Sequence, residues 1–202
     1  VYAEAMAAQV MDSSNAREEM ASVFIAVGNY RSMEMKYANA LDMYNKAIRY
    51  AEQTAIGPIS PRSLTLANAL TGRAHCHGLI NQQQEAVEDY RRAVGILKKL
   101  DVPEIMAQCL WDLSEALSTA GQYAQTIKTA DEAIKICIKI GSLAGMAGCN
   151  DTKAYAQYAL KRYKEAVVCW KEAARLWREE GEEQSLALSL ANQAEVLHVD
   201  LQ

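Results

Sequence analysis

Three adjacent residues, His75, Cys76 and His77, have side chains that could support metal binding or nucleophilic chemistry. Imidazole and thiolate groups bind zinc, and a Cys–His pair can act as a nucleophile with its base. On a helix, however, residues two positions apart point about 160° away from each other, because each residue turns the helix by about 100°. No other His or Cys lies three or four positions away to complete a set. We therefore expect no metal and no cofactor at this cluster.

Carboxylates and glycines give no further sign of catalysis. We interpret Glu179-Glu180 and Glu182-Glu183 as a solvated helix end rather than as an acid/base pair. The ten glycines are scattered singly, so no glycine-rich loop is present to hold a phosphate group. The sequence therefore predicts a protein that is not an enzyme.

Charge and cysteine usage narrow the classes of partner and the compartment. The formal net charge of −4 lacks the basic excess of nucleic-acid binders, and the basic run at Arg91-Arg92 and Lys98-Lys99 is interpreted as a solvated helix face. No apolar stretch approaches the roughly 20 residues that span a bilayer, so we expect no direct membrane insertion. The five cysteines are odd in number and widely spaced, which favours reduced thiols in a cytoplasmic protein.

A repeated pattern of small and large apolar residues indicates the elements that position these side chains. An aromatic residue is followed by a small residue, a large or small apolar residue and an alanine, at spacings of three, four and three. Residues at these spacings share one face of a helix. The second set lacks the leading aromatic residue. The sets are Tyr37, Ala40, Tyr44 and Ala47; Ala86, Tyr90 and Ala93; Tyr123, Thr126, Ala130 and Ala133; and Tyr163, Ala166, Trp170 and Ala173.

The repeat has a regular step and involves two helices. Its first small residue recurs at positions 40, 86, 126 and 166, in steps of 46, 40 and 40. A small residue in an upstream partner helix recurs in the same steps, at Gly28, Ala74, Ser114 and Ala154. Neither helix can bury its apolar face alone, so stacking such pairs forms one continuous core.

Together these residues resemble the tetratricopeptide repeat family, over nearly the whole chain. The units differ from the usual length of about 34 residues, because they repeat every 40 residues, and the proline that commonly closes a unit is missing. Long units of this kind are similar to those of Pins-type polarity adaptors, kinesin light chains and bacterial peptide-sensing regulators.

The expected fold is all-α, a right-handed α-solenoid of antiparallel helix pairs in a single domain, 1–202. We expect a partial repeat at 1–15, repeats at 16–61, 62–103, 104–141 and 142–181, and a partial repeat at 182–202. Ser142 is expected to start a helix, and Gly121, Gly141 and Gly181 to end helical runs. The expected helices span 1–11, 16–33, 37–55, 62–80, 83–100, 104–120, 123–140, 143–160, 163–180 and 183–199.

The resemblance implies that the first helix of each unit lines a concave groove. Trp111 and Tyr155 are the candidate aromatic anchors there, and the carboxylates nearby favour a partner with a basic segment. Packing of Trp111 beneath a neighbouring helix is an equally good interpretation. The candidate partner-binding residues are Asn29, Asn68, His75, Gln108, Trp111, Asp112, Glu115, Asp151, Tyr155 and Asn192.

The sequence thus favours a scaffold or adaptor domain that binds a peptide or helical segment of another protein in its groove. The alternative is a peptide-sensing regulatory domain that controls an effector region outside this chain. Apolar end faces at 1–11 and 186–201 also predict self-association through the ends of the solenoid.

Overall fold

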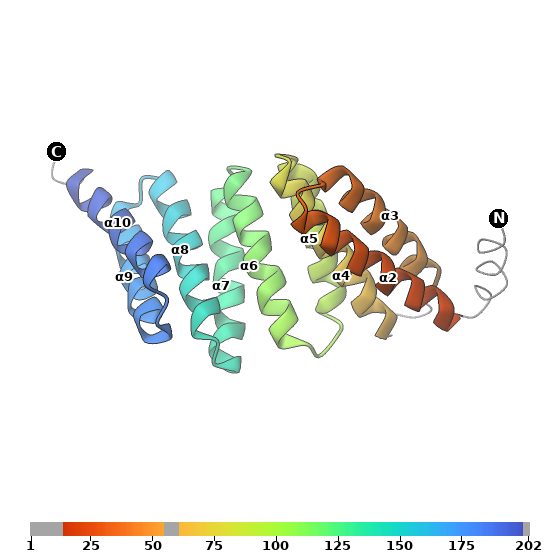
Figure 1. Ribbon diagram of the computed structural model, residues 1–202. Helices are drawn as coiled ribbons and strands as arrows, with labels where there is room; N and C mark the ends of the chain where they lie inside the picture. Colours follow the sequence, from red (N-terminus) through yellow and green to blue (C-terminus); the bar gives the residue numbers. More distant parts are fainter. Residues whose placement is uncertain (1–13, 55–60, 200–202) are drawn as a thin grey trace. The chain divides into compact units, whose positions relative to one another are not determined.

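The computed structural model describes residues 14–54 and 61–199, and in these ranges the chain forms nine α-helices and no strand (Figure 1). Each expected helix within these ranges is present. The largest difference lies at the end of α5, where the helix stops three residues before the expected position. The expected helix at 1–11 lies outside the described residues. The helices are α2 (Ser14–Met33), α3 (Tyr37–Thr54), α4 (Pro61–Leu79), α5 (Gln83–Leu97), α6 (Pro103–Thr119), α7 (Tyr123–Ile140), α8 (Leu143–Ala159), α9 (Tyr163–Glu180) and α10 (Glu183–Val199).

The chain divides into two compact units, 1–101 and 102–202. In the first unit, α2 packs against α3 and α4 packs against α5, while α3 contacts α4 and α2 contacts α4. In the second unit, α6 and α7 form one pair, α8 and α9 form the next, and α10 packs on α9. The first helices of neighbouring pairs in this unit, α6 and α8, also contact each other.

The small residues of the repeat let helices approach closely around one large side chain. Ala40 and Ala47 are fully buried on α3, and Tyr44 between them is 2% exposed. The Tyr44 ring lies against two glycines of the first helices, Gly28 on α2 and Gly72 on α4. A Cβ atom at Gly72 would lie only 2.4 Å from the Tyr44 Cε1 atom. The repeated pattern is therefore a packing register, as the sequence predicted.

A buried ion pair joins three helices of the first unit. The Arg73 guanidinium on α4 donates through Nε and one terminal nitrogen to the two carboxylate oxygens of Asp89 on α5, at 2.7 and 2.6 Å. Its other terminal nitrogen donates to the side-chain oxygen of Asn45 on α3, at 2.7 Å. Because Asp89 is buried, the two hydrogen bonds from Arg73 compensate for the hydration that its carboxylate loses on folding.

The turns within the helix pairs share one backbone feature in the repeat register. The residue that ends each turn has positive φ: 58° at Met35, 65° at Asn81, 72° at Gly121 and 59° at Lys161. These positions follow the same steps of 46, 40 and 40 as the packing residues. Only the third is a glycine, which adopts this left-handed conformation without steric cost.

The turns between pairs in the second unit match the expected capping. Gly141 and Gly181 are left-handed C-caps of α7 and α9. The Ser142 side chain accepts a hydrogen bond from the Gly145 amide at 3.2 Å and so begins α8. These caps fix where α8 begins, and with it the register of the residues that α8 presents to α6.

Candidate functional site

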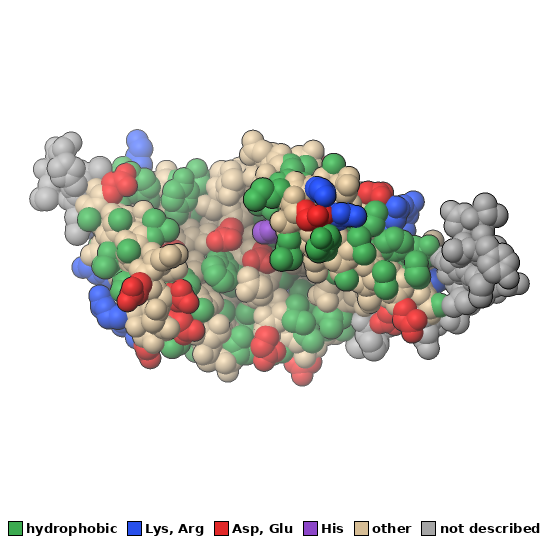
Figure 2. All heavy atoms as spheres, in the orientation of Figure 1, with side chains coloured by type: hydrophobic (Ala, Val, Ile, Leu, Met, Phe, Trp, Pro, Cys, Tyr) green, Lys and Arg blue, Asp and Glu red, His purple; other side chains and the backbone are tan. Residues whose placement is uncertain are grey.

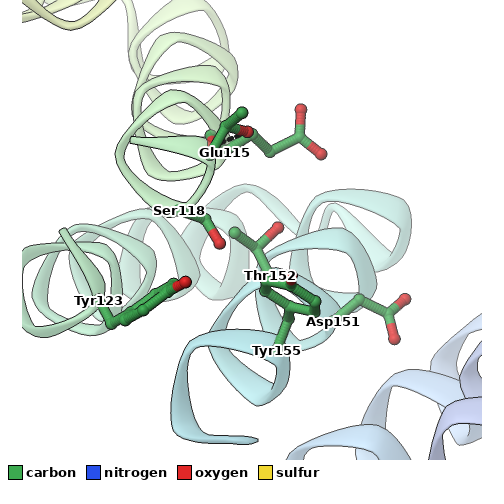
Figure 3. Close-up of a pocket in the computed structure, with 7 residues that line it drawn as sticks. Glu115, Ser118, Tyr123, Asp151, Thr152 and Tyr155 are labelled. Carbon is green, nitrogen blue, oxygen red and sulfur yellow. Dashed lines mark hydrogen bonds between the residues drawn. The ribbon is translucent and has the colours of Figure 1, made fainter. Parts of the chain in front are cut away.

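A pocket of about 530 Å³ lies between α6 and α8 in the second unit (Figure 3). In Figure 1, α6, α8 and α10 lie in front of α7 and α9, so the pocket belongs to the face formed by first helices. Figure 2 shows acidic atoms among polar and apolar ones on this face, with the basic atoms of the unit along its edges. The pocket is lined by Glu115, Ser118, Thr119, Tyr123, Asp151, Thr152 and Tyr155.

Helical spacing explains how these side chains converge. Ser114 on α6 and Ala154 on α8 are fully buried on the packing side of their helices. The residues next to them therefore project toward the open face: Glu115 from α6, and Tyr155, 52% exposed, from α8. The structure thus brings together three predicted site residues, Glu115, Asp151 and Tyr155.

The Glu115 carboxyl lies among groups that disfavour its charge. Its pKa is raised, first because neighbouring atoms remove part of its hydration and second because Asp112 repels it. The nearby indole N–H of Trp111 offsets part of this increase. No Lys or Arg of the described ranges forms an ion pair with Glu115. The pocket therefore holds a carboxylate whose negative charge is only weakly compensated.

Asp151 has a structural task as well as a place in the pocket. Its Oδ2 atom accepts a hydrogen bond from Trp177 Nε1 on α9 at 2.7 Å, and its Oδ1 atom accepts one from the Ser189 hydroxyl on α10, also at 2.7 Å. Burial nevertheless raises the pKa of the Asp151 carboxyl, because the two bonds only partly replace lost hydration. This carboxylate joins three helices, and its role as a partner contact stays a prediction.

Trp111 is half-buried and packs against the neighbouring first helix. Its indole ring lies over Gly148 of α8, where an added Cβ atom would be 2.1 Å from Trp111 Cζ2. Its Nε1 atom is buried without a hydrogen-bond partner of normal geometry in the described part of the chain. Of the two interpretations from the sequence, packing beneath a neighbouring helix describes most of this side chain. Asp112, next to it, accepts a hydrogen bond from Gln108 at 2.8 Å.

The other predicted site residues lie apart from this pocket. Asn29 on α2 accepts a hydrogen bond from the Tyr44 hydroxyl at 2.6 Å, which ties it to the packing of the first unit. Asn68 and His75 are exposed on α4, and Asn192 is half-buried on α10. None of these four lines the pocket between α6 and α8.

Four pocket residues were not among the predicted site residues: Ser118, Thr119, Tyr123 and Thr152. Ser118 and Thr119 lie three and four positions after Glu115, so extending the face by one helical turn would have found them. Tyr123 belongs to the repeat pattern, whose residues are expected to pack the helix pairs together. The Thr119 and Thr152 hydroxyls each donate to the backbone carbonyl four residues earlier, at 3.0 Å.

The His75-Cys76-His77 cluster is dispersed as the helical step predicts. Cys76 is fully buried, His75 is exposed, and His77 Nδ1 lies 2.6 Å from the Gln82 side-chain oxygen. Within residues 14–54 and 61–199, His, Cys, Asp and Glu side chains do not gather in groups of three that could hold a metal ion. Over the same ranges, no helix has the length and apolar character needed to cross a bilayer.

Solved structures with the same fold are tetratricopeptide-type repeat proteins. Aspartyl phosphate phosphatase F from Bacillus subtilis superposes with a TM-score of 0.75 at 14% identity, covering 86% of this chain and 44% of that one. The Rap conjugation gene regulator of plasmid pLS20, in complex with the Phr* peptide, gives 0.62 at 18% identity, covering 85% and 48%. TPR-like repeats of a putative kinesin light chain from Podosopora anserina give 0.65 at 15% identity, covering 87% and 93%.

These likenesses confirm the fold class predicted from the sequence, an all-α solenoid of antiparallel helix pairs of the tetratricopeptide type. The chain spans about half the length of aspartyl phosphate phosphatase F and of the conjugation gene regulator, and nearly all of the kinesin light chain repeats. No known sequence family matches the chain, and no curated protein sequence matches it.

Proposed function

We propose that this chain is a protein-interaction domain that binds a peptide or helical segment of a partner protein on the face of α6 and α8. The pocket between these helices carries the proposal. It places an exposed aromatic ring, Tyr155, beside two carboxylates on first helices, which is the composition of an interface anchor with a polar surround. The carboxylates favour a partner with a basic segment.

Binding rather than catalysis is the proposed role. Asp151 is held by two hydrogen bonds from α9 and α10, and the Ser118 hydroxyl in the pocket has no hydrogen-bonded base among the described residues. A serine nucleophile needs such a base within hydrogen-bond reach. The arrangement therefore supports a scaffold or adaptor, although one similar structure is named a phosphatase.

A cytoplasmic location is part of the proposal. All five cysteines of the chain are buried and form no disulfide. Free thiols persist in reducing compartments, whereas secreted domains usually pair them.

Self-association through the end of the solenoid is also proposed, because two leucines on α10, Leu188 and Leu190, are exposed. Sedimentation velocity of the chain and of its Leu188→Glu variant tests it, and an unchanged monomer in both would overturn it.

A peptide-sensing regulatory domain is the second candidate. One of the similar structures is a Rap regulator in complex with a peptide, and this chain covers 48% of its length. In this version a peptide on the α6–α8 face changes the activity of an effector region elsewhere in a longer protein. A peptide that binds without any change in such a full-length protein supports the adaptor instead.

Selection from a random peptide library tests the proposed function directly. We expect enriched peptides to bind the domain and to lose at least about tenfold in affinity with Tyr155→Ala, because an aromatic anchor contributes more than about 1.4 kcal/mol. The matched control is Tyr30→Ala on α2, a tyrosine of similar exposure in the other unit. Failure to enrich any peptide, or equal loss with both variants, would overturn the proposal.

A further inference from the structure

Every side chain that lines the pocket between α6 and α8 ends in oxygen. Two of the seven are carboxylates, Glu115 and Asp151, and the other five are hydroxyls of Ser, Thr and Tyr. Carboxylates accept hydrogen bonds only, and hydroxyl oxygens accept them readily. The pocket wall therefore contains many acceptors and no side-chain N–H donor, so a complementary ligand group is rich in N–H donors.

Ser118 at the inner end of the pocket supplies a hydroxyl that is available to a ligand. Its residue is 8% exposed, and Figure 3 shows its hydroxyl pointing toward the space between α6 and α8. This hydroxyl forms no hydrogen bond with any other described residue. Its oxygen is not among the fully enclosed unpaired polar atoms of the described residues, so water can enter the pocket and bond to it. An N–H donor of a ligand can take the place of that water.

Within the described part of the chain, no Lys or Arg side chain pairs with the carboxylates that line the pocket. Some carboxylates of the second unit have basic partners, as Asp131 has Lys153 at 2.6 Å and Glu172 has Arg175 at 2.7 Å. Within the described ranges, neither Glu115 nor Asp151 forms an ion pair. Both residues line the pocket, but the Asp151 carboxylate points toward α9 and α10, whose hydrogen-bond donors balance it, so Glu115 is the carboxylate that a ligand can reach (Figure 3). A positively charged ligand group is the electrostatic complement.

Two tyrosine rings in the pocket favour a planar cation. Tyr123 projects from the start of α7 and Tyr155 from α8, on different sides of the pocket (Figure 3). Aromatic faces attract cations, and the planar guanidinium of arginine also stacks on them. Its five N–H donors match a wall of oxygen acceptors better than the three donors of an ammonium group.

We infer that this pocket binds the guanidinium group of an arginine side chain from the partner segment. The inference rests on the proposed function and specifies the residue that the partner inserts. Glu115 accepts the charged hydrogen bond, Ser118 accepts one N–H at the inner end, and the tyrosine rings lie along the flat faces. The volume of about 530 Å³ falls in the usual range of ligand pockets, roughly 300–1,000 Å³, and leaves room for adjacent peptide backbone.

The test uses three small probes and NMR titration of the whole chain. Nα-acetyl-L-arginine N-methylamide is the ligand, its citrulline analogue replaces the guanidinium by a neutral urea of the same shape, and its lysine analogue keeps the charge. We expect the arginine probe to bind with a Kd on the order of 1 mM, with amide shifts in 115–123 and 148–155. Citrulline should bind at least about tenfold more weakly and lysine about threefold more weakly.

Matched variants separate the pocket from general surface charge. Glu115→Gln should weaken the arginine probe about fivefold to tenfold and Ser118→Ala about threefold, because each removes one acceptor from the cation. Glu165→Gln, an exposed glutamate on α9 outside the pocket, should change nothing. Circular dichroism of each variant confirms that it remains folded.

The outcomes distinguish the guanidinium site from the proposed function. Equal affinity for arginine and citrulline, or arginine shifts that survive Glu115→Gln, would overturn the guanidinium site. If library peptides that lack arginine bind the α6–α8 face and the arginine probe does not, the inference is wrong and the proposed function stands. If neither the probe nor any selected peptide contacts this face, both are wrong.

Discussion

Replacing Asp151 tests whether one carboxylate holds the last helix in place. The carboxylate on α8 accepts hydrogen bonds from Trp177 on α9 and from Ser189 on α10. Asp151→Ala removes both bonds. Ser189 keeps its second acceptor, the Ser185 carbonyl at 3.0 Å, whereas the buried indole N–H of Trp177 loses its only hydrogen-bond partner in the described structure.

The expected cost follows from these contacts. Leaving a buried donor unpaired costs about 1–3 kcal/mol, and a hydrogen bond to a charged group contributes about 1.5–3 kcal/mol. Removing a carboxylate whose pKa is raised by burial returns part of this, because its desolvation no longer opposes folding. We expect a net loss of about 2 kcal/mol. Asp151→Asn should cost less than about 1 kcal/mol, since its amide oxygen can accept from Trp177 and its N–H can donate to the Ser189 hydroxyl.

Hydrogen exchange followed by mass spectrometry locates this loss. If α10 opens locally, about 2 kcal/mol corresponds to roughly 30-fold faster exchange of its amides. Exchange in α6 and α7 should remain close to that of the unaltered chain. Equal exchange of α10 in the Ala and Asn variants would refute the reasoning, because the hydrogen bond to Trp177 would then contribute nothing. A double-mutant cycle with Trp177→Phe should show a coupling of about 1 kcal/mol or more.

Four other substitutions give separate tests, each by chemical denaturation. Gly148→Ala should destabilise by about 1–3 kcal/mol because its Cβ atom overlaps the Trp111 ring, and adding Trp111→Leu should recover part of the loss; an unchanged midpoint in the single variant contradicts this packing. Lys161→Gly should stabilise by about 1 kcal/mol by relieving its φ of 59°, and a loss of stability would count against strain there. Asp89→Ala should cost about 3 kcal/mol because it leaves the guanidinium of α4 without its carboxylate; a loss below about 1 kcal/mol would show that the pair is weakly coupled. The pKa of Glu115 is raised in the folded state, which therefore holds the carboxyl proton more tightly than the unfolded chain does. The stabilising contribution of this group is present below the ordinary pKa of 4.5 and is lost as the pH rises through the raised pKa. Glu115→Gln should therefore flatten the pH dependence of stability in that window, and an unaltered dependence would disprove this prediction.

The fold could be predicted because the residues that pack its helices recur at short, regular spacings along the chain. The small residues at Ala40 and Ala47 and the tyrosine between them are three and four positions apart, so one helix face could be recognised without knowing its partner. The repeat at steps of 40 then supplied the pairing of helices. Left-handed turn residues other than glycine, such as Met35 and Lys161, carry no such signal in their residue types.

The site could be predicted only in part because its decisive contacts are between distant residues. Periodicity placed Glu115, Asp151 and Tyr155 on the open face. The bonds from Asp151 to Trp177 and Ser189 cross 26 and 38 residues, and no local spacing encodes them. The position of Trp111 depends on the absence of a side chain at Gly148, and small polar residues such as Ser118 are equally common in a helix core and a pocket wall.

The burial of all five thiols makes the native chain suitable for attaching a spectroscopic reporter. Maleimide dyes react with accessible thiolates, and buried thiols in apolar surroundings are inert. A single cysteine introduced at an exposed position, for example in place of Val168 on α9, would therefore carry the label without prior removal of the native cysteines. The fluorescence of such a labelled chain could then follow ligand binding on the opposite face of the helix pair.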